Sequence, residues 1–308
     1  MRLTHNRAVL LMVLVTMLWS TAGVVSRHLE AARSFEVTFW RSLFNALALL
    51  VAMRVLRGPG FWRAGLRGGW PLWMSAACWV VMYTNFMLAI TLTTVATVLI
   101  TMSIAPLLTA LFSRLFLHHR LPLRTWLAIG AAGIGIAWMF GQQALQDPGS
   151  LTGILVALGV PLAGAANWTL LQHLQQRHGR APQHAPPDML LAVLLGAIGS
   201  ALITLPMAWP FSASVHDLGL LAALGVFQLA IPCLLVVQVA RVLSAPEVSL
   251  IGLLEVLFGV LLTWLGAGEA PGPAALTGGA LVLGALLGNE ALALRERQRK
   301  RQRPRQRI

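Results

Sequence analysis

Residues 89–138 have the sequence AITLTTVATVLITMSIAPLLTALFSRLFLHHRLPLRTWLAIGAAGIGIAW, and a weaker version occupies residues 240–287: ARVLSAPEVSLIGLLEVLFGVLLTWLGAGEAPGPAALTGGALVLGALL. Both stretches open with a turn of small residues and Ser or Thr, continue as a long apolar run, break at a short polar loop, and turn apolar again. Aligned on these loops, His119 faces Glu269, 150 residues later. An internal repeat of apolar segments indicates a membrane protein whose two halves enclose a site.

Composition agrees with a membrane protein, because 57% of the residues are hydrophobic and only 11% are charged. Soluble domains carry about 25% charged residues. Residues 68–113 contain no Asp, Glu, Lys or Arg, which is enough for two spans at roughly 20 residues each. Backbone groups in lipid need internal hydrogen bonds, and long unbroken apolar runs favour helices over a closed barrel. We therefore expect an all-α membrane protein.

Ten transmembrane helices are predicted, at about residues 8–27, 35–56, 70–90, 94–116, 123–141, 151–173, 188–206, 217–240, 246–265 and 273–293. They divide into a first five-helix repeat (1–146), a second (147–294) and a basic cytoplasmic tail (295–308), which we expect to be disordered near anionic lipid. The fifth and tenth helices carry small-residue stripes, Ala131/Gly135 and Ala280/Gly284/Gly288, typical of packing helices outside a site.

The formal net charge of +13 maps onto topology. With the amino terminus inside, 20 of the 23 basic residues fall in segments predicted to be cytoplasmic: Arg2, Arg7, Arg54, Arg57, Arg63, Arg67, Arg114, Arg120, Arg124, Arg177, Arg180, Arg241 and the eight after Asn289. This positive-inside pattern places both termini in the cytoplasm of a bacterial-type inner membrane. Since topology accounts for the charge, we expect membrane lipid and no nucleic acid as a partner.

An odd number of helices per repeat makes the second half enter the membrane in the opposite sense. The charges agree, because the loop around Arg114–Arg124 is basic whereas its counterpart around Gly266–Pro273 has no Lys or Arg. Two inverted five-helix repeats around a central cavity are an architecture of secondary transporters.

Several mid-span residues could line such a cavity. Trp79, Tyr83 and Phe86 share one helix face. The predicted substrate-binding set is Trp19, Trp79, Tyr83, Phe86, Thr97, Thr101, Trp168 and Gln228. Core or lipid-facing packing is the alternative for each aromatic residue, and the two threonine hydroxyls could bond back to their own helix.

Three charged residues lie within or beside spans. Glu255 is near the middle of an apolar span, where a carboxylate should be protonated, paired or exposed to water. It is a candidate for proton coupling or for binding a substrate amine, with a structural hydrogen bond as the alternative. For Arg41 a structural role is favoured, as a partner of Glu36 or of helix carbonyls near the outer interface. Glu247 and Ser244 have capping-box spacing.

Enzyme and metal signatures are missing from the sequence. It has no Walker loop, HExxH or GxSxG motif, so we expect neither an enzyme nor a primary pump, and no cofactor. Cys78 and Cys233 lack metal-ligand or disulfide spacing and are interpreted as packing residues. His118, His119 and His173 lack the acidic or Cys companions of a metal site.

The chain resembles the ten-helix drug/metabolite transporters of the EamA type over residues 8–293. The resemblance rests on Trp19-Ser20, Phe39-Trp40-Arg41, the Ser/Thr turn at 91–97, Ala105-Pro106, Asn167-Trp168, Ser244-Ala-Pro-Glu247, Leu254-Glu255 and Gly268-Glu269. Within this group it looks most like the YddG-type exporters of aromatic amino acids. It departs from the family at the mid-span Glu-Pro pairs, where it has Ala105-Pro106 and Glu255-Val256, and at His118-His119, where the family has Gly-Glu.

The resemblance implies a secondary transporter that exports small organic metabolites by alternating access. The expected substrates are amino acids with aromatic or apolar side chains, and the protein would be a monomer or homodimer. Two alternatives stay open: an exporter of other metabolites or drugs, and a non-transporting membrane protein that uses its Gly/Ala stripes for assembly.

Overall fold

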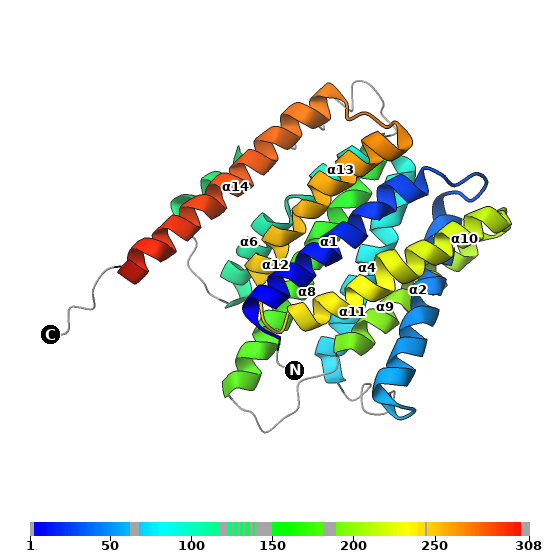
Figure 1. The fold of residues 1–308 in the computed structure, drawn as a ribbon, viewed down its shortest axis with the longest axis horizontal. Coiled ribbons are helices and arrows are strands. Elements are labelled where there is room, and N and C mark those ends of the chain that lie inside the picture. Colours follow the sequence, from blue (N-terminus) through cyan, green and yellow to red (C-terminus); the bar gives the residue numbers. More distant parts are fainter. Residues whose placement is uncertain are drawn as a thin grey trace.

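A computed structural model describes residues 3–61, 68–117, 122–124, 126–128, 130–131, 133–135, 138, 150–180, 189–243 and 245–302, and all their regular structure is helical (Figure 1). The first half contains α1 (His5–Ser26), α2 (Ser34–Arg57), α4 (Gly69–Leu92), α5 (Val95–Met102) and α6 (Ala105–Leu117). The second contains α8 (Ser150–Arg180), α9 (Met189–Ala208), α10 (Val215–Ala223), η2 (Leu224–Ala230), α11 (Ile231–Val239), α12 (Ala245–Gly252), α13 (Leu254–Ala267) and α14 (Pro273–Gln302).

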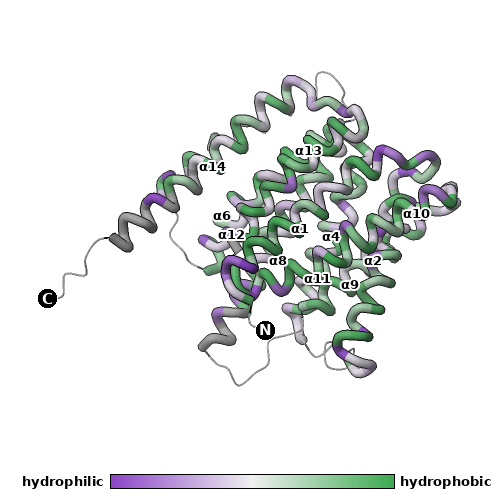
Figure 2. Tube along the Cα trace, viewed as in Figure 1, coloured by the Kyte–Doolittle hydropathy of each residue, from purple (hydrophilic) through white to green (hydrophobic). Residues whose placement is uncertain are grey.

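Eight helical segments among the described residues are long and apolar enough to cross a membrane: His5–Ser26, Ser34–Arg57, Gly69–Leu92, Val95–Leu117, Leu151–Leu174, Met189–Ala208, Val215–Val239 and Glu247–Ala267. Shorter apolar helices at Trp126–Gly135 and Leu276–Ala285 fall in the predicted fifth and tenth spans. Apolar residues dominate the helices, and hydrophilic residues gather toward their ends (Figure 2). The all-helical membrane class is thus confirmed, while the count of ten remains a prediction.

The two halves exchange their first helices. α1 packs against α11, α12 and α13 of the second half, and α8 packs against α4, α5 and α6 of the first half. α2 of the first half also packs against α9 of the second half. Each half therefore buries its first helix in the other half, and neither is a separate folding unit.

The fourth span of each half, which is the fourth and the ninth span of the chain, is broken near its middle. α5 and α12 are eight residues long and begin 150 residues apart, at Val95 and Ala245. Thr94 caps α5 by accepting a hydrogen bond from the Thr97 backbone N–H. Because Pro106 has no N–H to donate to the carbonyl four residues earlier, the helix stops at Met102 and restarts at Ala105. The second break follows Gly252, a poor helix former.

The eighth span changes its winding in its middle third. Between α10 and α11 the chain forms the π-helix η2. Pro232 lies two residues beyond the end of η2. Its ring and missing N–H disturb the carbonyl four residues earlier, which is that of Gln228. The widened turn places Gln228 where an α-helix would not, and such π segments recur at functional sites.

Small residues let the helices cross closely. A Cβ at Gly225 of η2 would lie 2.6 Å from Phe44 Cβ and 2.8 Å from the Arg41 carbonyl of α2. A Cβ at Gly135 would meet the Gly278 carbonyl of α14 at 2.8 Å, so this part of the predicted packing stripe is in close contact. Gly284 has no atom of the described residues close enough to need its small size.

Two buried carboxylates fasten the connections at the end of the bundle opposite the N-terminus. We call this end, with residues 27–33, 209–214 and 268–272, the distal end (Figure 1). Glu36 accepts from the Ser212 and Ala213 backbone N–H groups at 2.9 and 2.8 Å. Asp217 accepts from the backbone N–H groups of residues 30–32 at 2.8–2.9 Å. Each half therefore holds a loop of the other.

The basic tail is helical where it is described. α14 runs along one side of the bundle and continues through Gln302, so the expectation of disorder is wrong for residues 295–302 (Figure 1). Arginine and lysine are good helix formers, and positive charge is favourable at a helix C-terminus. Some residues named above lie outside the described part of the chain: 303–308 of the tail, His118 and His119 of the first loop, and Ser244, which was predicted to form a capping box with Glu247.

Candidate functional site

A cavity of about 140 Å³ lies between the two halves. Both helix breaks border it, through Met102–Pro106 on one side and Gly252–Val256 on the other. Six of the eight residues of the predicted set line it, namely Trp19, Trp79, Tyr83, Phe86, Trp168 and Gln228. The coupling candidate Glu255 lines it as well. A protein cavity of about 150 Å³ holds a benzene-sized molecule. The volume therefore suits a small solute.

The aromatic residues form one continuous wall. Trp79 stacks obliquely on Tyr83 with ring centroids 5.3 Å apart, and Trp168 of α8 meets Trp79 edge-on at 6.0 Å. Gly196 of α9 makes room for this wall, because a Cβ there would lie 2.3 Å from that of Trp79. The helical spacing seen in the sequence thus becomes one apolar face that contacts both halves.

Tyr83 and Cys233 are joined across the repeat. The Tyr83 hydroxyl donates to Cys233 Sγ at 3.2 Å, and the two residues are 150 positions apart. A mid-membrane hydroxyl needs a partner, and here the equivalent position of the other half supplies it. Cys233 therefore borders the cavity, whereas sequence analysis assigned it to packing alone.

Arg41 of α2 is fully buried and also borders the cavity. Its Nη1 donates to Gln228 Oε1 at 3.3 Å, its Nη2 to the Tyr83 carbonyl at 3.0 Å, and its guanidinium lies 5.6 Å from the Phe86 ring centroid. Gln228 Nε2 in turn donates to the Trp19 carbonyl at 3.3 Å. These two contacts orient the Gln228 amide, because Arg41 can only donate to its oxygen and the Trp19 carbonyl can only accept from its nitrogen.

The expected pairing of Arg41 with Glu36 is absent. The Glu36 carboxylate is taken by the loop at Ser212 and by Trp40 Nε1, and Arg41 forms no ion pair with any described carboxylate. The helix explains this, because residues five apart do not share a face. The expectation of a carbonyl partner was right, since Nη2 donates to the Tyr83 carbonyl. The side chain points into the bundle and borders the cavity, and its depth in the membrane stays a prediction.

Glu255 lies in the first turn of α13. The N-terminus of a helix favours negative charge. Because the ninth span is broken just before α13, this helix N-terminus stabilises the charged form of the Glu255 carboxylate. Glu255 has no hydrogen bond or ion pair with a described residue, although it lines the cavity. It is therefore available to a proton or to a cationic group within the cavity.

Thr97 and Thr101 are buried but do not line the cavity. Thr94 Oγ1 donates to Thr97 Oγ1 at 2.7 Å, and Thr101 Oγ1 donates to the Thr97 carbonyl at 2.8 Å. These contacts correspond to the alternative in which both hydroxyls bond within their own helix.

A group of flexible residues that was not predicted from the sequence also lines the cavity. Met12, Met82 and Met102 contribute polarizable thioethers, and Ser103 and Ser249 add hydroxyls next to the two breaks. Methionine adapts its shape to varied ligands. Pro106 could have predicted the place of Ser103, because a proline in an apolar run marks a helix break and Ser103 lies at that break.

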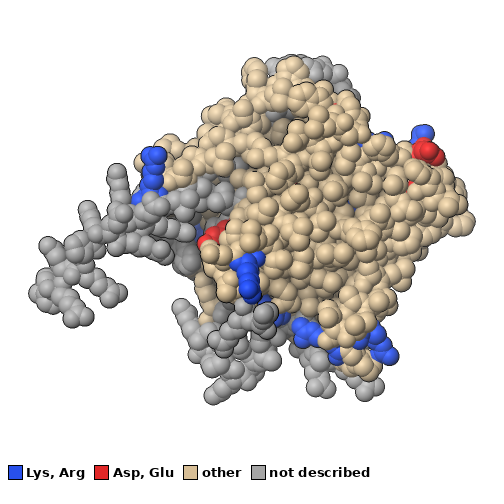
Figure 3. All heavy atoms as spheres, in the orientation of Figure 1, with Lys and Arg blue, Asp and Glu red and all other residues tan. Residues whose placement is uncertain are grey.

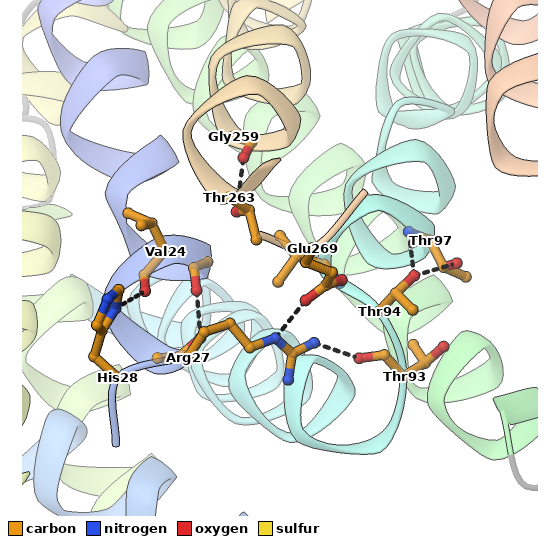
Figure 4. A network of polar contacts seen from close by, with 12 residues as sticks. Val24, Arg27, His28, Thr93, Thr94, Thr97, Gly259, Thr263 and Glu269 are labelled. Atoms are coloured by element: carbon orange, nitrogen blue, oxygen red, sulfur yellow. Dashed lines mark hydrogen bonds and ion pairs between the residues drawn. The ribbon is translucent and has the colours of Figure 1, made fainter. Parts of the chain in front are cut away.

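The distal end of the cavity is closed by two layers. The inner layer is an apolar cluster that includes Ala22, Ile90, Val95 and Val98, which follow or precede the lining residues along α1, α4 and α5. Figure 4 shows the outer layer, in which Arg27 Nε donates to Glu269 Oε2 at 2.5 Å.

The same two side chains tie three segments together. Arg27 Nη2 donates to the Thr93 carbonyl at 3.0 Å (Figure 4). Glu269 Oε1 also accepts the Val95 backbone N–H at 2.7 Å. We call Arg27, Glu269 and these two backbone groups the distal latch. It connects the ends of α1 and α13 with the start of α5, so it joins the two halves.

No three His, Cys, Asp or Glu side chains among the described residues come together as a metal site. The described part of the site is instead an apolar chamber with one arginine, one glutamate and one glutamine. This set can hold a small solute and orient it by charge.

Comparison with known proteins supports the two-half architecture. No curated protein matches the chain. A solved structure, titled only as the crystal structure of a protein, is 21% identical with a TM-score of 0.61, and the match covers 94% of this chain and 99% of that one. That similarity concerns the fold. The EamA-like transporter family matches residues 6–141 and again residues 151–289, which together are most of the sequence. The chain therefore belongs to the EamA-like transporter family.

Proposed function

We propose that the protein is a secondary transporter that exports small organic solutes, foremost amino acids with aromatic or apolar side chains, by alternating access. The observation that carries the proposal is the cavity between the halves, bordered by both broken helices and walled by Trp79, Tyr83 and Trp168. Broken helices around a central site are a recurring feature of secondary transporters. The aromatic substrates are carried over from the resemblance of the sequence to YddG-type exporters, and this finer placement is part of the proposal.

The proposal includes an inverted arrangement of the two repeats, which is the arrangement that alternating access uses in many transporters. Because α1 packs into the second half and α8 into the first, rocking of one half changes equivalent contacts at both ends. The distal latch and the apolar cluster beneath it close the distal end. We propose that this end faces the exterior and that these contacts keep the cavity closed on that side.

The proposed location is a bacterial-type inner membrane with both termini in the cytoplasm. Figure 3 shows charged side chains near the ends of the visible face and none across its broad middle. Arg54 and Arg57 end α2 at the side away from the distal end. Thiol labelling tests this orientation in a Cys78→Ala/Cys233→Ser background. We expect a Gln143→Cys variant to react with an impermeant reagent in intact cells, and protection there contradicts the inverted topology.

Transport itself is tested in proteoliposomes that contain the purified protein. Preloaded with L-phenylalanine, they should accumulate labelled L-phenylalanine by exchange, whereas protein-free liposomes should not. A protein that binds but never moves a panel of amino acids, other metabolites and drugs supports the alternative, a membrane interaction or assembly protein. Movement of drugs but not amino acids supports the other alternative, and light scattering distinguishes monomer from homodimer.

A further inference from the structure

Arg41 is a charge whose partner is missing from the described protein. Its side chain has no solvent exposure, and its Nε is buried with no hydrogen-bond acceptor. A guanidinium has five N–H donors, of which the described contacts use one on Nη1 and one on Nη2. Both acceptors, Gln228 and a carbonyl, are neutral. An arginine inside a membrane domain is costly unless it is paired or functional.

The described carboxylates do not fill this gap. Glu36 is saturated by the Ser212 loop, and Asp217 by the backbone of residues 30–32. Glu269 pairs with Arg27. Glu255 lines the same cavity but forms no ion pair with Arg41. The guanidinium of Arg41 therefore has no described carboxylate in contact with it, although it borders the cavity.

We infer that Arg41 binds the carboxylate of the transported solute, so that a carboxylate is a required group of the substrate. The inference rests on the proposed function and narrows it. Arginine matches the planar geometry of a carboxylate and forms stronger hydrogen bonds with it than with neutral acceptors. Gln228 and Tyr83 hold the guanidinium in place, and Phe86 covers one of its faces. Glu255 also lines the cavity and has no hydrogen bond or ion pair with a described residue, so it is available to an amino group of the same solute.

Binding of three matched probes to the purified wild-type protein tests the inference. L-phenylalanine has a carboxylate and an amine, 3-phenylpropanoate has only the carboxylate, and L-phenylalaninamide has only the amine. Binding is followed by tryptophan fluorescence, because Trp19, Trp79 and Trp168 line the cavity. We expect the two carboxylates to bind about tenfold or more tightly than the amide. Equal or tighter binding of the amide, or no binding of either carboxylate, overturns the inference.

Arg41→Gln assigns the preference to this residue. It should weaken phenylalanine binding by about ten- to a hundredfold while leaving phenylalaninamide unchanged. Arg33→Gln is the matched control, because it removes an exposed arginine that does not line the cavity. Wild-type affinity for phenylalanine in folded Arg41→Gln overturns the inference. If that variant does not fold, Arg41→Lys keeps the charge but loses the planar fork, and it should lose part of the preference; a full wild-type preference in it overturns the inference.

The two proposals fail in different ways. Wild-type protein that prefers carboxylates but moves no solute in proteoliposomes refutes the transport function and leaves the carboxylate site standing. Wild-type protein that exchanges phenylalanine and phenylalaninamide equally well supports transport and overturns the role of Arg41.

Discussion

Removing the charge of Glu269 should open the distal end of the protein. Glu269 links Arg27 at the end of α1 with the start of α5, where it accepts the Val95 N–H at 2.7 Å. Glu269→Gln keeps the size and one acceptor but removes the ion pair. If the distal latch forms only in the distally closed state, its loss shifts the population toward the distally open state.

The size of the shift follows from exposure. The side chains of Arg27 and Glu269 are 31% and 19% exposed, so the pair is neither at the surface nor buried. Surface pairs contribute about 0.2–1 kcal/mol, and a hydrogen bond to a charged group about 1.5–3 kcal/mol. We take roughly 1–2 kcal/mol for the latch, which corresponds to a factor of about 5–30 in the population ratio.

Thiol accessibility measures this population. Ala105→Cys, in the Cys78→Ala/Cys233→Ser background, places a thiol on the cavity wall. We expect Glu269→Gln to raise its labelling from outside by about fivefold or more. High salt should also raise the labelling of the Ala105→Cys parent that keeps Glu269, because the Arg27–Glu269 pair is partly exposed and salt screens it.

Glu30→Gln is the matched control, since Glu30 is an exposed carboxylate near the distal end without a described side-chain bond. It should label like the parent. If Glu269→Gln labels at the parental rate, or if both variants label equally fast, the distal latch does not hold the closed state and the reasoning from its geometry is wrong.

Three further predictions concern the cavity and its frame. Glu255→Gln should keep phenylalanine exchange but lose accumulation driven by a pH gradient, and unchanged accumulation contradicts a coupling role. Ala at Trp19, Tyr83 or Trp168 should lower transport without lowering the amount of protein in the membrane, whereas normal transport in all three removes the aromatic site. Gly225→Ala should cost about 1–3 kcal/mol of stability, measured as a lower midpoint of thermal unfolding in detergent, because its Cβ would meet α2 at 2.6–2.8 Å. Gly219→Ala, with no atom close enough to clash, is its control.

The frame of the protein was predictable because hydropathy is a property of single segments. Apolar runs predicted the helices, and the alignment of His119 with Glu269 gave a repeat of 150 residues. The structure has the same spacing between the starts of α5 and α12 and between Tyr83 and Cys233. The helix breaks were less visible, although Pro106 marks one of them.

The contacts between helices were not predictable in this way. The partners of Arg41 lie 42 and 187 residues away in the sequence, so the helical spacing within α2 argues against Glu36 but does not identify them. Thr97 and Trp79 both lie on polar or aromatic helix faces, but only the packing of α4 and α5 determines that Trp79 reaches the cavity and Thr97 does not. A periodic pattern defines a face, and tertiary packing selects what that face meets.

The repeat and the charges of the cavity do different work under the proposed function. Alternating access needs two end states of similar free energy, and two halves of equivalent fold provide them. A net direction of transport needs residues that are present in one half and not in the other. At the breaks, Glu255 of α13 stands where α6 has Ala105, so only the second half carries a carboxylate, while Arg41 comes from α2 of the first half. Under the proposed function, a solute with a carboxylate and an amine meets one ionisable side chain from each half. We infer that the symmetric fold permits the motion and that these two unequal residues couple it to the bound solute.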